Sequence, residues 1–287
     1  MTAVTTTHAT TAAPAPPAPR GLWLRAFLTL SRRRLALSAA TPREVLVPLL
    51  TPILFALVIA PAIAKTIGVG TGGLDYKTFV AVGTVGLLVP LSCTFAGIGV
   101  IVDRESGARR DLIAAPVPRA LLVLGNLTVA LAVSGLQVAV LLLATVLSGA
   151  HFDATGAGVV WFVAATILFA AGSYGMAESL AHRIRTQEEY VGATPAVALL
   201  PWFFAGSLYP ISALPAGLTG IAKVFPLTHA LAVMRYGLLD RRGAGLHDIW
   251  GMSDPGVEAL LSLAVVAVFA VALTALSIRV FNRAAVR

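Results

Sequence analysis

Ionisable and nucleophilic side chains are few in this 287-residue chain, and their spacing limits the chemistry that it could perform. ATP hydrolysis would need a phosphate-binding loop that ends in Gly-Lys followed by Ser or Thr. The only lysines follow Ala64, Tyr76 and Ala222, so the chain has no such loop. Its five histidines are scattered over separate predicted loops, and the single cysteine, Cys93, lies in an apolar run where a small buried side chain is expected. The sequence therefore predicts neither an ATPase site nor a metal centre.

One carboxylate, Glu178, lies inside a long apolar stretch, about one turn from its predicted end. Ion-coupled carriers place carboxylates or histidines at membrane depth, because a proton relay must be protonated there. Two interpretations stay open: Glu178 is either a proton or substrate site, or an interfacial carboxylate paired with Arg183 or Arg185. The nearby helix end favours the second, so we do not expect ion coupling to drive this protein.

A charged segment, residues 103–119, joins two apolar stretches and is closed by Pro116 and Pro118. A simple solvated turn would not need this length. The segment is short, charged and amphipathic, which suits a surface that presses against a soluble partner. Because the chain has no energy source of its own, we expect a separate ATPase to bind there.

Trp202, Phe203 and Phe204 follow Pro201 inside another apolar stretch, deeper than the interfacial positions that membrane aromatics prefer. A kinked, aromatic-rich helix suits the path of a flat apolar molecule. Packing or lipid-facing roles suit the same residues, and this alternative stays open. Asn126 and Gln137 are eleven residues apart, on nearly one helix face, and are expected to form interhelix hydrogen bonds.

The amino-acid composition indicates that these elements lie in a membrane rather than in water. Apolar residues make up 57% of the chain and charged residues only 12%, and the mean hydropathy is +0.87. Soluble domains carry about 25% charged residues, so a soluble enzyme is excluded. The net charge of +8 is better explained by orientation in a membrane than by nucleic acid, and no nucleic-acid partner is expected.

The sequence predicts an all-α membrane protein with six transmembrane helices. Residues 1–19 are rich in Thr, Ala and Pro and predict a disordered cytoplasmic tail. Residues 21–40 predict an amphipathic helix on the inner leaflet, with Arg25 and Arg32–Arg34 facing away from its apolar side. The spans are expected at residues 45–64, 79–102, 120–148, 159–180, 191–209 and 257–278, within one transmembrane domain of residues 20–287.

Basic residues are unequally distributed over the two sides of this topology. Six spans place both termini on one side, together with 15 of the 21 Lys and Arg residues, and leave 6 on the other. The positive-inside rule then places both termini in the cytoplasm. We therefore expect a multi-pass protein of the plasma membrane, and the preference for Arg over Lys agrees with a bacterial source.

Residues 211–239 fit neither a span nor a solvated loop. Two apolar runs, Ile211–Phe225 and Leu227–Leu239, are interrupted by Pro215 and Pro226. The second run would form about 20 Å of helix, against a hydrocarbon core of about 30 Å. We expect two short re-entrant helices on the outer side.

The second of these helices carries His229 and Arg235. A guanidinium is expensive at the centre of a bilayer but tolerable near headgroups. A lipid headgroup or Asp240 is the expected partner.

Two segments resemble the signatures of a known family, the ABC-2 type membrane subunits of ATP-binding-cassette exporters, and the resemblance covers most of residues 21–287. One is the charged, Gly-containing inner loop with an Ala-Pro-Val-x-Arg run. The other follows the fifth span and consists of a small-Gly pair, aromatic-Pro, Leu-Pro, Pro-Leu-Thr and a later Arg. The matching residues are Glu105, Gly107, Leu112, Pro116, Val117 and Arg119, then Ala205, Gly206, Tyr209, Pro210, Leu214, Pro215, Pro226, Leu227, Thr228 and Arg235. The family often has Ser before its Gly, whereas this chain has Ala205 there and Ser207 after the Gly. The daunorubicin-resistance type is the most similar.

The resemblance implies a permease that pairs as a homodimer or with a related chain and binds two ATPase subunits on the inner face. The implied coupling residues are Arg104, Glu105, Gly107, Arg109, Leu112, Pro116 and Arg119. The implied substrate path lies between the two halves, near Trp202, Phe203, Phe204, Gly206 and Tyr209. Its outer cap would include Pro210, Pro215, Pro226, His229 and Arg235. ATP and Mg²⁺ would be bound by the partner, with no cofactor on this chain.

Three classes of function follow from these observations. The first is the membrane subunit of an ATP-driven exporter for a hydrophobic or amphiphilic substrate, such as a drug, an antibiotic or a lipid-like molecule. Export of a cell-envelope lipid or polysaccharide would use a similar frame. An ion-coupled carrier is disfavoured by the nearly charge-free spans, and a membrane-bound lipid enzyme by the scattered histidines.

Overall fold

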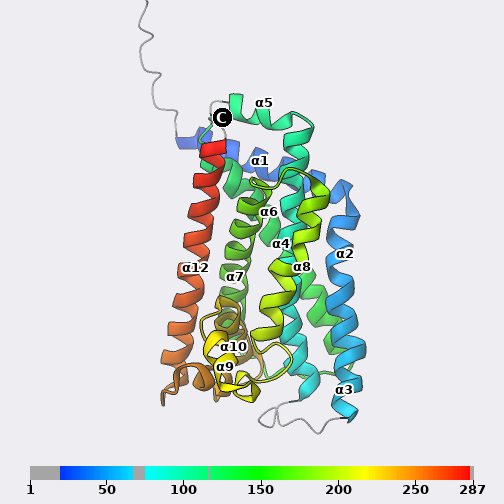
Figure 1. Cartoon of the computed structure of the whole chain (residues 1–287), viewed down its shortest axis with the longest axis vertical. Coiled ribbons are helices and arrows are strands. Elements are labelled where there is room, and N and C mark those ends of the chain that lie inside the picture. Colours follow the sequence, from blue (N-terminus) through cyan, green and yellow to red (C-terminus); the bar gives the residue numbers. More distant parts are fainter. Residues whose placement is uncertain (1–19, 67–74, 116, 285–287) are drawn as a thin grey trace, which may run out of the picture.

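The computed structural model describes residues 20–66, 75–115 and 117–284. Within these ranges every regular element is a helix, and the long helices run side by side in one bundle (Figure 1). The all-α prediction is confirmed. The predicted tail, residues 1–19, and the predicted coupling residue Pro116 lie outside the described residues.

The helices follow the apolar stretches of the sequence closely. A π-helical segment, η1, joins α2 and α3 without a break, and a 3-10 turn, η2, precedes α9. The bounds are α1 Arg20–Ala40, α2 Pro42–Leu54, η1 Phe55–Ile59, α3 Ala60–Thr66, α4 Tyr76–Glu105, α5 Ala108–Ala114, α6 Arg119–Leu147, α7 Gly156–Ala181, α8 Gln187–Phe204, η2 Ile211–Ala213, α9 Ala216–Ala222, α10 Pro226–Leu238, α11 Ala244–Trp250 and α12 Pro255–Ala284.

Several of these helices are long and apolar enough to cross a bilayer. Judged by length and composition, five stretches of the described chain qualify, and the bent pair of α9 and α10 would be a sixth if it formed one span. The five stretches are Val45–Ile63, Tyr76–Glu105, Arg119–Leu147, Gly156–Ala181 and Pro255–Arg283. They correspond to five of the six spans predicted from the sequence and indicate a multi-pass membrane protein.

The predicted span 191–209 differs most from the structure. Its helix, α8, starts earlier, with Gln187 and two glutamates, and ends at Phe204, so it is not one of the five apolar stretches. It ends there because the chain turns at Gly206, whose φ of 76° is left-handed. In Figure 1, α8 nevertheless runs alongside α4 for much of the length of the bundle.

The two ends of the bundle are built differently. α1, α5 and the last turn of α12 lie at one end, the upper end in Figure 1, which we call the α5 end. α9, α10 and α11 lie at the opposite end, which we call the α10 end. α7 finishes at the α5 end and α12 begins at the α10 end, so the chain must cross the bundle between them, and α8 makes that crossing.

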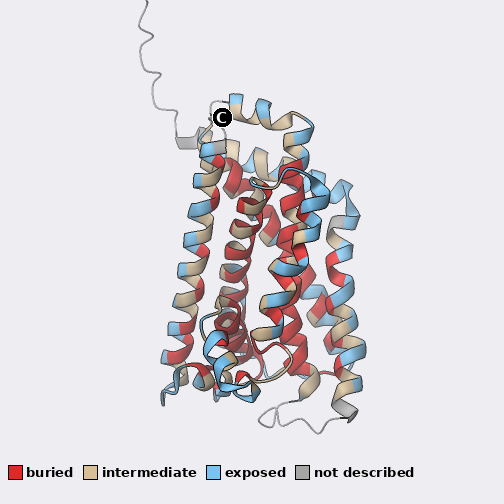
Figure 2. Cartoon of the chain, in the orientation of Figure 1, coloured by how far each residue is buried: buried red, intermediate tan, exposed pale blue. Residues whose placement is uncertain are grey.

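α4 forms the centre of the bundle. It packs against α2, α6, α7 and α8 and is buried along most of its length (Figure 2). α12, in contrast, is buried mainly where it meets α7. A Cβ added at Gly175 of α7 would lie 2.6 Å from the backbone of Leu273 in α12, so glycine permits this close approach. The outer face of α12 exposes Leu260, Val268 and Val271, as expected of a surface in contact with lipid.

α1 occupies the predicted residues and packs against α6. Leu24 and Leu28 are exposed, whereas Arg34 turns inward and donates a hydrogen bond of 2.7 Å to the carbonyl of Ala96. The prediction was that Arg32–Arg34 face away from the apolar side of this helix, toward polar surroundings, and Arg34 instead lies buried against α4. The reason is local, because Gly99 of α4 has no side chain and leaves room for the guanidinium.

Residues 211–239 contain short helices, and the second predicted run, Leu227–Leu239, corresponds closely to α10, Pro226–Leu238. α9 and α10 are bent by 82° at the break between them. The first predicted run is divided into η2 and α9, because Pro215 stands between them and starts α9. Pro226 is the first residue of α10, where its missing N–H costs nothing. A third short helix, α11, was not predicted.

Candidate functional site

α5 lies across the α5 end of the bundle, outside the long helices (Figure 1). α4 ends at Glu105, which is exposed, and Gly107 then takes a left-handed φ of 81° that turns the chain into α5. The chain re-enters the bundle at Arg119, which donates a 3.5 Å hydrogen bond to the carbonyl of Asn282 in α12. The predicted coupling segment is therefore a short helix held at both ends.

Arg104 attaches this segment to the end of α7. Its guanidinium donates hydrogen bonds to the carbonyls of Ala181, Ile184 and Arg185, at 3.1, 2.9 and 2.8 Å. The last carbonyls of a helix have no partner within the helix, and a cation satisfies them well. Arg104 thus fixes the turn before α5 to the connection between α7 and α8.

Arg109 and Leu112 hold the inner face of α5. The guanidinium carbon of Arg109 lies 5.6 Å from the centre of the Phe281 ring, a cation–π contact with α12. Burial lowers the pKa of Arg109, and the positive charge of Arg104 lowers it further. Leu112 packs on the apolar cluster that contains Leu122 and Phe281. α5 therefore packs on both α6 and α12.

Glu178 lies just beneath α5, but its predicted partners were wrong. Its Oε2 accepts a 3.0 Å hydrogen bond from the Ser277 hydroxyl, and its Oε1 lies 3.9 Å from Nε2 of His182. Arg183 and Arg185 follow the end of α7 and are exposed. His182 is four residues from Glu178, so helical geometry places the two on one face. That spacing was the sequence signal for the pair, and it was missed.

A small cavity of about 30 Å³ connects these groups below α5. Its lining includes Arg109, Glu178, His182 and Phe281, and the ring of His182 packs edge-on against Phe281 with 5.4 Å between centroids. One or two water molecules would fit such a space. The α5 end thus holds a continuous set of contacts from an exposed helix into the interface between α7 and α12.

The aromatic residues of α8 do not share one environment. Trp202 is fully buried, donates a 2.8 Å hydrogen bond from its indole to the carbonyl of Gly83, and meets the ring of Phe55 edge-on. Phe203 is 44% exposed. Tyr209 donates from its hydroxyl to the carbonyl of Phe203 at 2.9 Å, so it closes the turn that follows α8. Phe204 is half-buried.

Arg235 lies deep in the α10 end. Its guanidinium donates to the carbonyls of Gly206, Ser207 and Phe79, at 2.8, 3.0 and 3.3 Å, and stacks on the Phe79 ring with 3.5 Å to the ring centre. The expected pairing with Asp240 is therefore wrong. The carbonyls of Gly206 and Ser207 are available because the left-handed turn at Gly206 ends α8 and leaves both residues outside a helix, whereas Phe79 lies in the first turn of α4.

His229 is buried at the same end and bonds only within the protein. One ring nitrogen lies 2.9 Å from the carbonyl of Lys223, and the other lies 3.2 Å from the hydroxyl of Ser262. The lipid-headgroup partner that the sequence suggested is not needed to satisfy this ring. Of the two polar residues predicted on α6, Gln137 donates to the carbonyl of Val45 in α2 and so makes an interhelix hydrogen bond.

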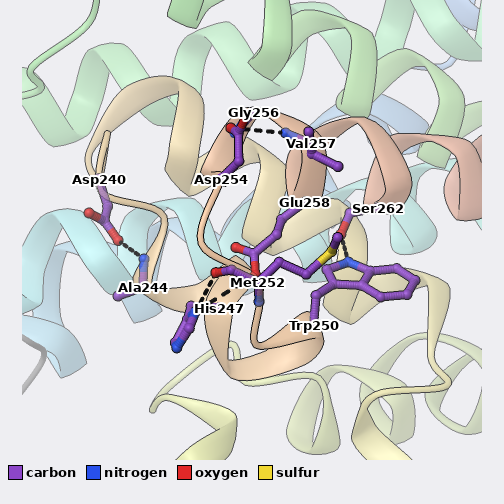
Figure 3. Close-up of polar contacts among 10 residues, drawn as sticks. All are labelled: Asp240, Ala244, His247, Trp250, Met252, Asp254, Gly256, Val257, Glu258 and Ser262. Carbon is purple, nitrogen blue, oxygen red and sulfur yellow. Dashed lines mark hydrogen bonds and ion pairs between the residues drawn. The ribbon is translucent and has the colours of Figure 1, made fainter.

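Further polar contacts close the connection between α11 and α12 (Figure 3). The buried carboxylate of Glu258 accepts a 2.6 Å hydrogen bond from the backbone N–H of Met252 and lies 3.7 Å from Nδ1 of His247. Trp250 donates to the hydroxyl of Ser262 at 2.8 Å. Across the described chain, no three His, Cys, Asp or Glu side chains are grouped so that they could hold a metal ion.

Comparison with known families agrees with this geometry. The model of the ABC-2 type transporter family matches residues 25–239, a stretch that runs from α1 to the end of α10 and includes α5 and Arg235. No curated protein matches the chain. Because the matched stretch covers well over half of the sequence, the chain belongs to the ABC-2 type transporter family and is a membrane permease component of an ABC transporter, not an enzyme.

Proposed function

We propose that this permease belongs to an ATP-driven exporter, of the daunorubicin-resistance type, that moves a hydrophobic or amphiphilic substrate out of the cytoplasm or the inner leaflet. The ABC-2 family normally works with ATP-binding-cassette ATPase subunits. This chain has no Gly-Lys-Ser/Thr sequence, so ATP and Mg²⁺ would be bound by those partners. The substrate is a drug, an antibiotic or a lipid-like molecule.

The proposal rests on how α5 is attached to the bundle, with one side exposed and the other in contact with long helices. Its outer side, which includes Arg110 and Asp111, is exposed. Its inner side contacts α12 through Arg109, and Arg104, at the end of α4, fixes the turn before α5 to the end of α7. A helix that is free on one face and fixed on the other suits a lever that a soluble partner pushes. Glu105, exposed at the turn, would contact the ATPase.

The α5 end would face the cytoplasm. α1, α5 and the end of α12 meet there, and the inner loop and both terminal regions carry most of the arginines of the chain. The protein would lie in the plasma membrane of a bacterium, with α1 along the inner leaflet and α9 and α10 as re-entrant helices on the outer side.

The substrate would move along a path between two permease copies, or between this chain and a related one. Phe203, with its exposed ring, is the aromatic residue of α8 best placed to meet such a molecule. Trp202 does not line this path. Its hydrogen bond to Gly83 of α4 holds α8 in position. The exposed apolar faces of α2 and α8 suit an amphiphile better than a sugar, so we prefer a lipid-like or drug substrate to a polysaccharide.

Reversal of one charge tests the coupling role. Glu105→Arg should leave insertion and thermal stability unchanged, because Glu105 is exposed, but should abolish stimulation of the co-purified ATPase and ATP-dependent uptake of a hydrophobic dye by inside-out vesicles. Glu188→Arg, an exposed glutamate of α8 at the same end, is the matched control. Unchanged ATPase stimulation in the Glu105 variant would remove α5 as the coupling element.

A further inference from the structure

The α10 end contains a cavity of about 310 Å³ with polar and apolar walls. It lies between the start of α4, the turn after α8, and helices α10 and α11. The side chains that matter for its chemistry are Phe79, Thr228, Arg235, Tyr236, Asp240 and Asp248. Ligand sites in proteins start at about this size, and they combine apolar walls with a few polar groups, as this cavity does.

The inner wall of the cavity is cationic. Arg235 is only 8% exposed, and in the described part of the chain no carboxylate lies within ion-pair distance of it. Three backbone carbonyls accept from its terminal nitrogens, but its Nε has no partner. The hydroxyl of Thr228, which is 3% exposed, also has none. Buried charges are normally paired, so an anionic group in the cavity would complete this site.

The outer wall is anionic. Asp240 and Asp248 line the same cavity and are more exposed than Arg235, so they lie nearer its opening. Asp240 accepts from the backbone N–H groups of Arg242 and Ala244, and Asp248 accepts from the Ser212 hydroxyl. These donors are neutral, so no cationic side chain pairs with either carboxylate in the described part of the chain. The cavity is therefore positive inside and negative at its mouth.

We propose that this cavity binds a zwitterion that carries a phosphate and a primary ammonium, the chemistry of an ethanolamine phospholipid headgroup. The phosphate lies against Arg235 and Thr228, and the ammonium donates hydrogen bonds to Asp240 and Asp248. A choline headgroup has no N–H to donate, and a purely anionic headgroup is repelled by the two carboxylates at the mouth. This end of the bundle is where headgroups would meet the protein, and the binding requires neither ATP nor a direction of transport.

Binding to the purified full chain in detergent tests the proposal, with short-chain phosphatidylethanolamine, phosphatidylcholine and phosphatidylglycerol as probes and calorimetry as the measurement. The ethanolamine lipid should bind at least about 10-fold more tightly than the other two, the loss expected when one or two charged hydrogen bonds are missing. Equal affinity for all three lipids would overturn the proposal. Glycerophosphoethanolamine, which has no acyl chains, separates the two sources of this chemistry. If it binds, a free soluble zwitterion is a ligand, and if only the lipid binds, the headgroup must come from the bilayer.

Variants locate the site without disturbing the carbonyl contacts of Arg235. Ala244→Phe should fill the cavity from its exposed rim and abolish binding, whereas Ala216→Phe, at the equivalent first position of α9 and outside the cavity, should not. Thr228→Val, which keeps the shape of the side chain, should weaken binding about 3- to 10-fold. Asp248→Asn should remove the preference for ethanolamine over choline. If the Ala244→Phe variant binds the ethanolamine lipid with unchanged affinity, the lipid binds elsewhere and the proposal is wrong.

Discussion

The two ends of the bundle use one kind of contact for opposite purposes. At each end a guanidinium donates to three backbone carbonyls. Arg104 bonds the end of α7 and the residues that follow it, and Arg235 bonds the turn after α8 and Phe79 in the first turn of α4. Arg104 is half-buried and supports α5, whose outer face is free. Arg235 is buried and joins α10 to the turn after α8 and to α4.

The difference lies in what surrounds each arginine. At the α5 end, α5 lies outside the bundle. A partner protein could therefore displace α5 without exposing the buried core between the long helices. The α10 end folds its short helices back onto α4, α7 and α12, so its contacts are part of the core. We therefore expect substitutions at the α10 end to reduce stability and those at the α5 end to reduce communication with a partner.

The largest loss of stability is expected for Trp202→Ala. It removes a fully buried indole and its hydrogen bond to Gly83, and loss of a buried aromatic side chain costs about 3–5 kcal/mol. Phe203→Ala, on the exposed side of the same helix, should cost less than about 1 kcal/mol but reduce dye transport. Thermal unfolding in detergent measures the first effect, and uptake by inside-out vesicles the second. Equal losses of stability would contradict the different burial of the two rings.

The next largest effect is expected for Arg235→Leu. Three carbonyls lose their donor, at about 1 kcal/mol or more each, so the free energy of unfolding should fall by roughly 3 kcal/mol. The matched substitution Arg242→Leu, exposed at the same end, should change stability by less than about 0.5 kcal/mol. If thermal unfolding shows no difference between the two variants, the carbonyl contacts of Arg235 do not hold this end together.

Arg104→Ala should have a smaller effect on stability, about 2 kcal/mol, because its three hydrogen bonds lie closer to solvent. Its signature should be local: amides of residues 182–186 should exchange hydrogen faster, and ATPase stimulation should fall. Arg110→Ala, an exposed residue of α5, is the control for removal of charge. Unchanged exchange in the Arg104 variant would mean that the turn is held by other contacts.

The smallest effect is expected for Ser277→Ala. It removes one hydrogen bond to Glu178 across the interface of α7 and α12, and such bonds between membrane helices contribute about 0.6 kcal/mol. The change in unfolding temperature should be barely resolved. A loss above about 2 kcal/mol would contradict this estimate and show that the bond between Ser277 and Glu178 is a main contact of the α7–α12 interface.

The sequence alone was enough to predict an all-α membrane protein, five of its spans, the charged inner segment and the family. These follow from the length and composition of apolar stretches and from short motifs, which depend on neighbours along the chain. It also indicated breaks at Pro215 and Pro226, and in the structure these prolines stand at the starts of α9 and α10, because the missing N–H of proline acts locally.

Partners of the buried charges were decided by tertiary structure. The sequence suggested a lipid headgroup or Asp240 as the partner of Arg235. For Glu178 it left open a proton or substrate site, or pairing with Arg183 or Arg185, because oppositely charged residues nearby are the obvious candidates. In the structure, Arg235 meets carbonyls 28, 29 and 156 residues away, and Glu178 meets Ser277, 99 residues away. Carbonyls at helix ends are invisible in a sequence, since every residue has one, and only packing shows which of them lack a partner.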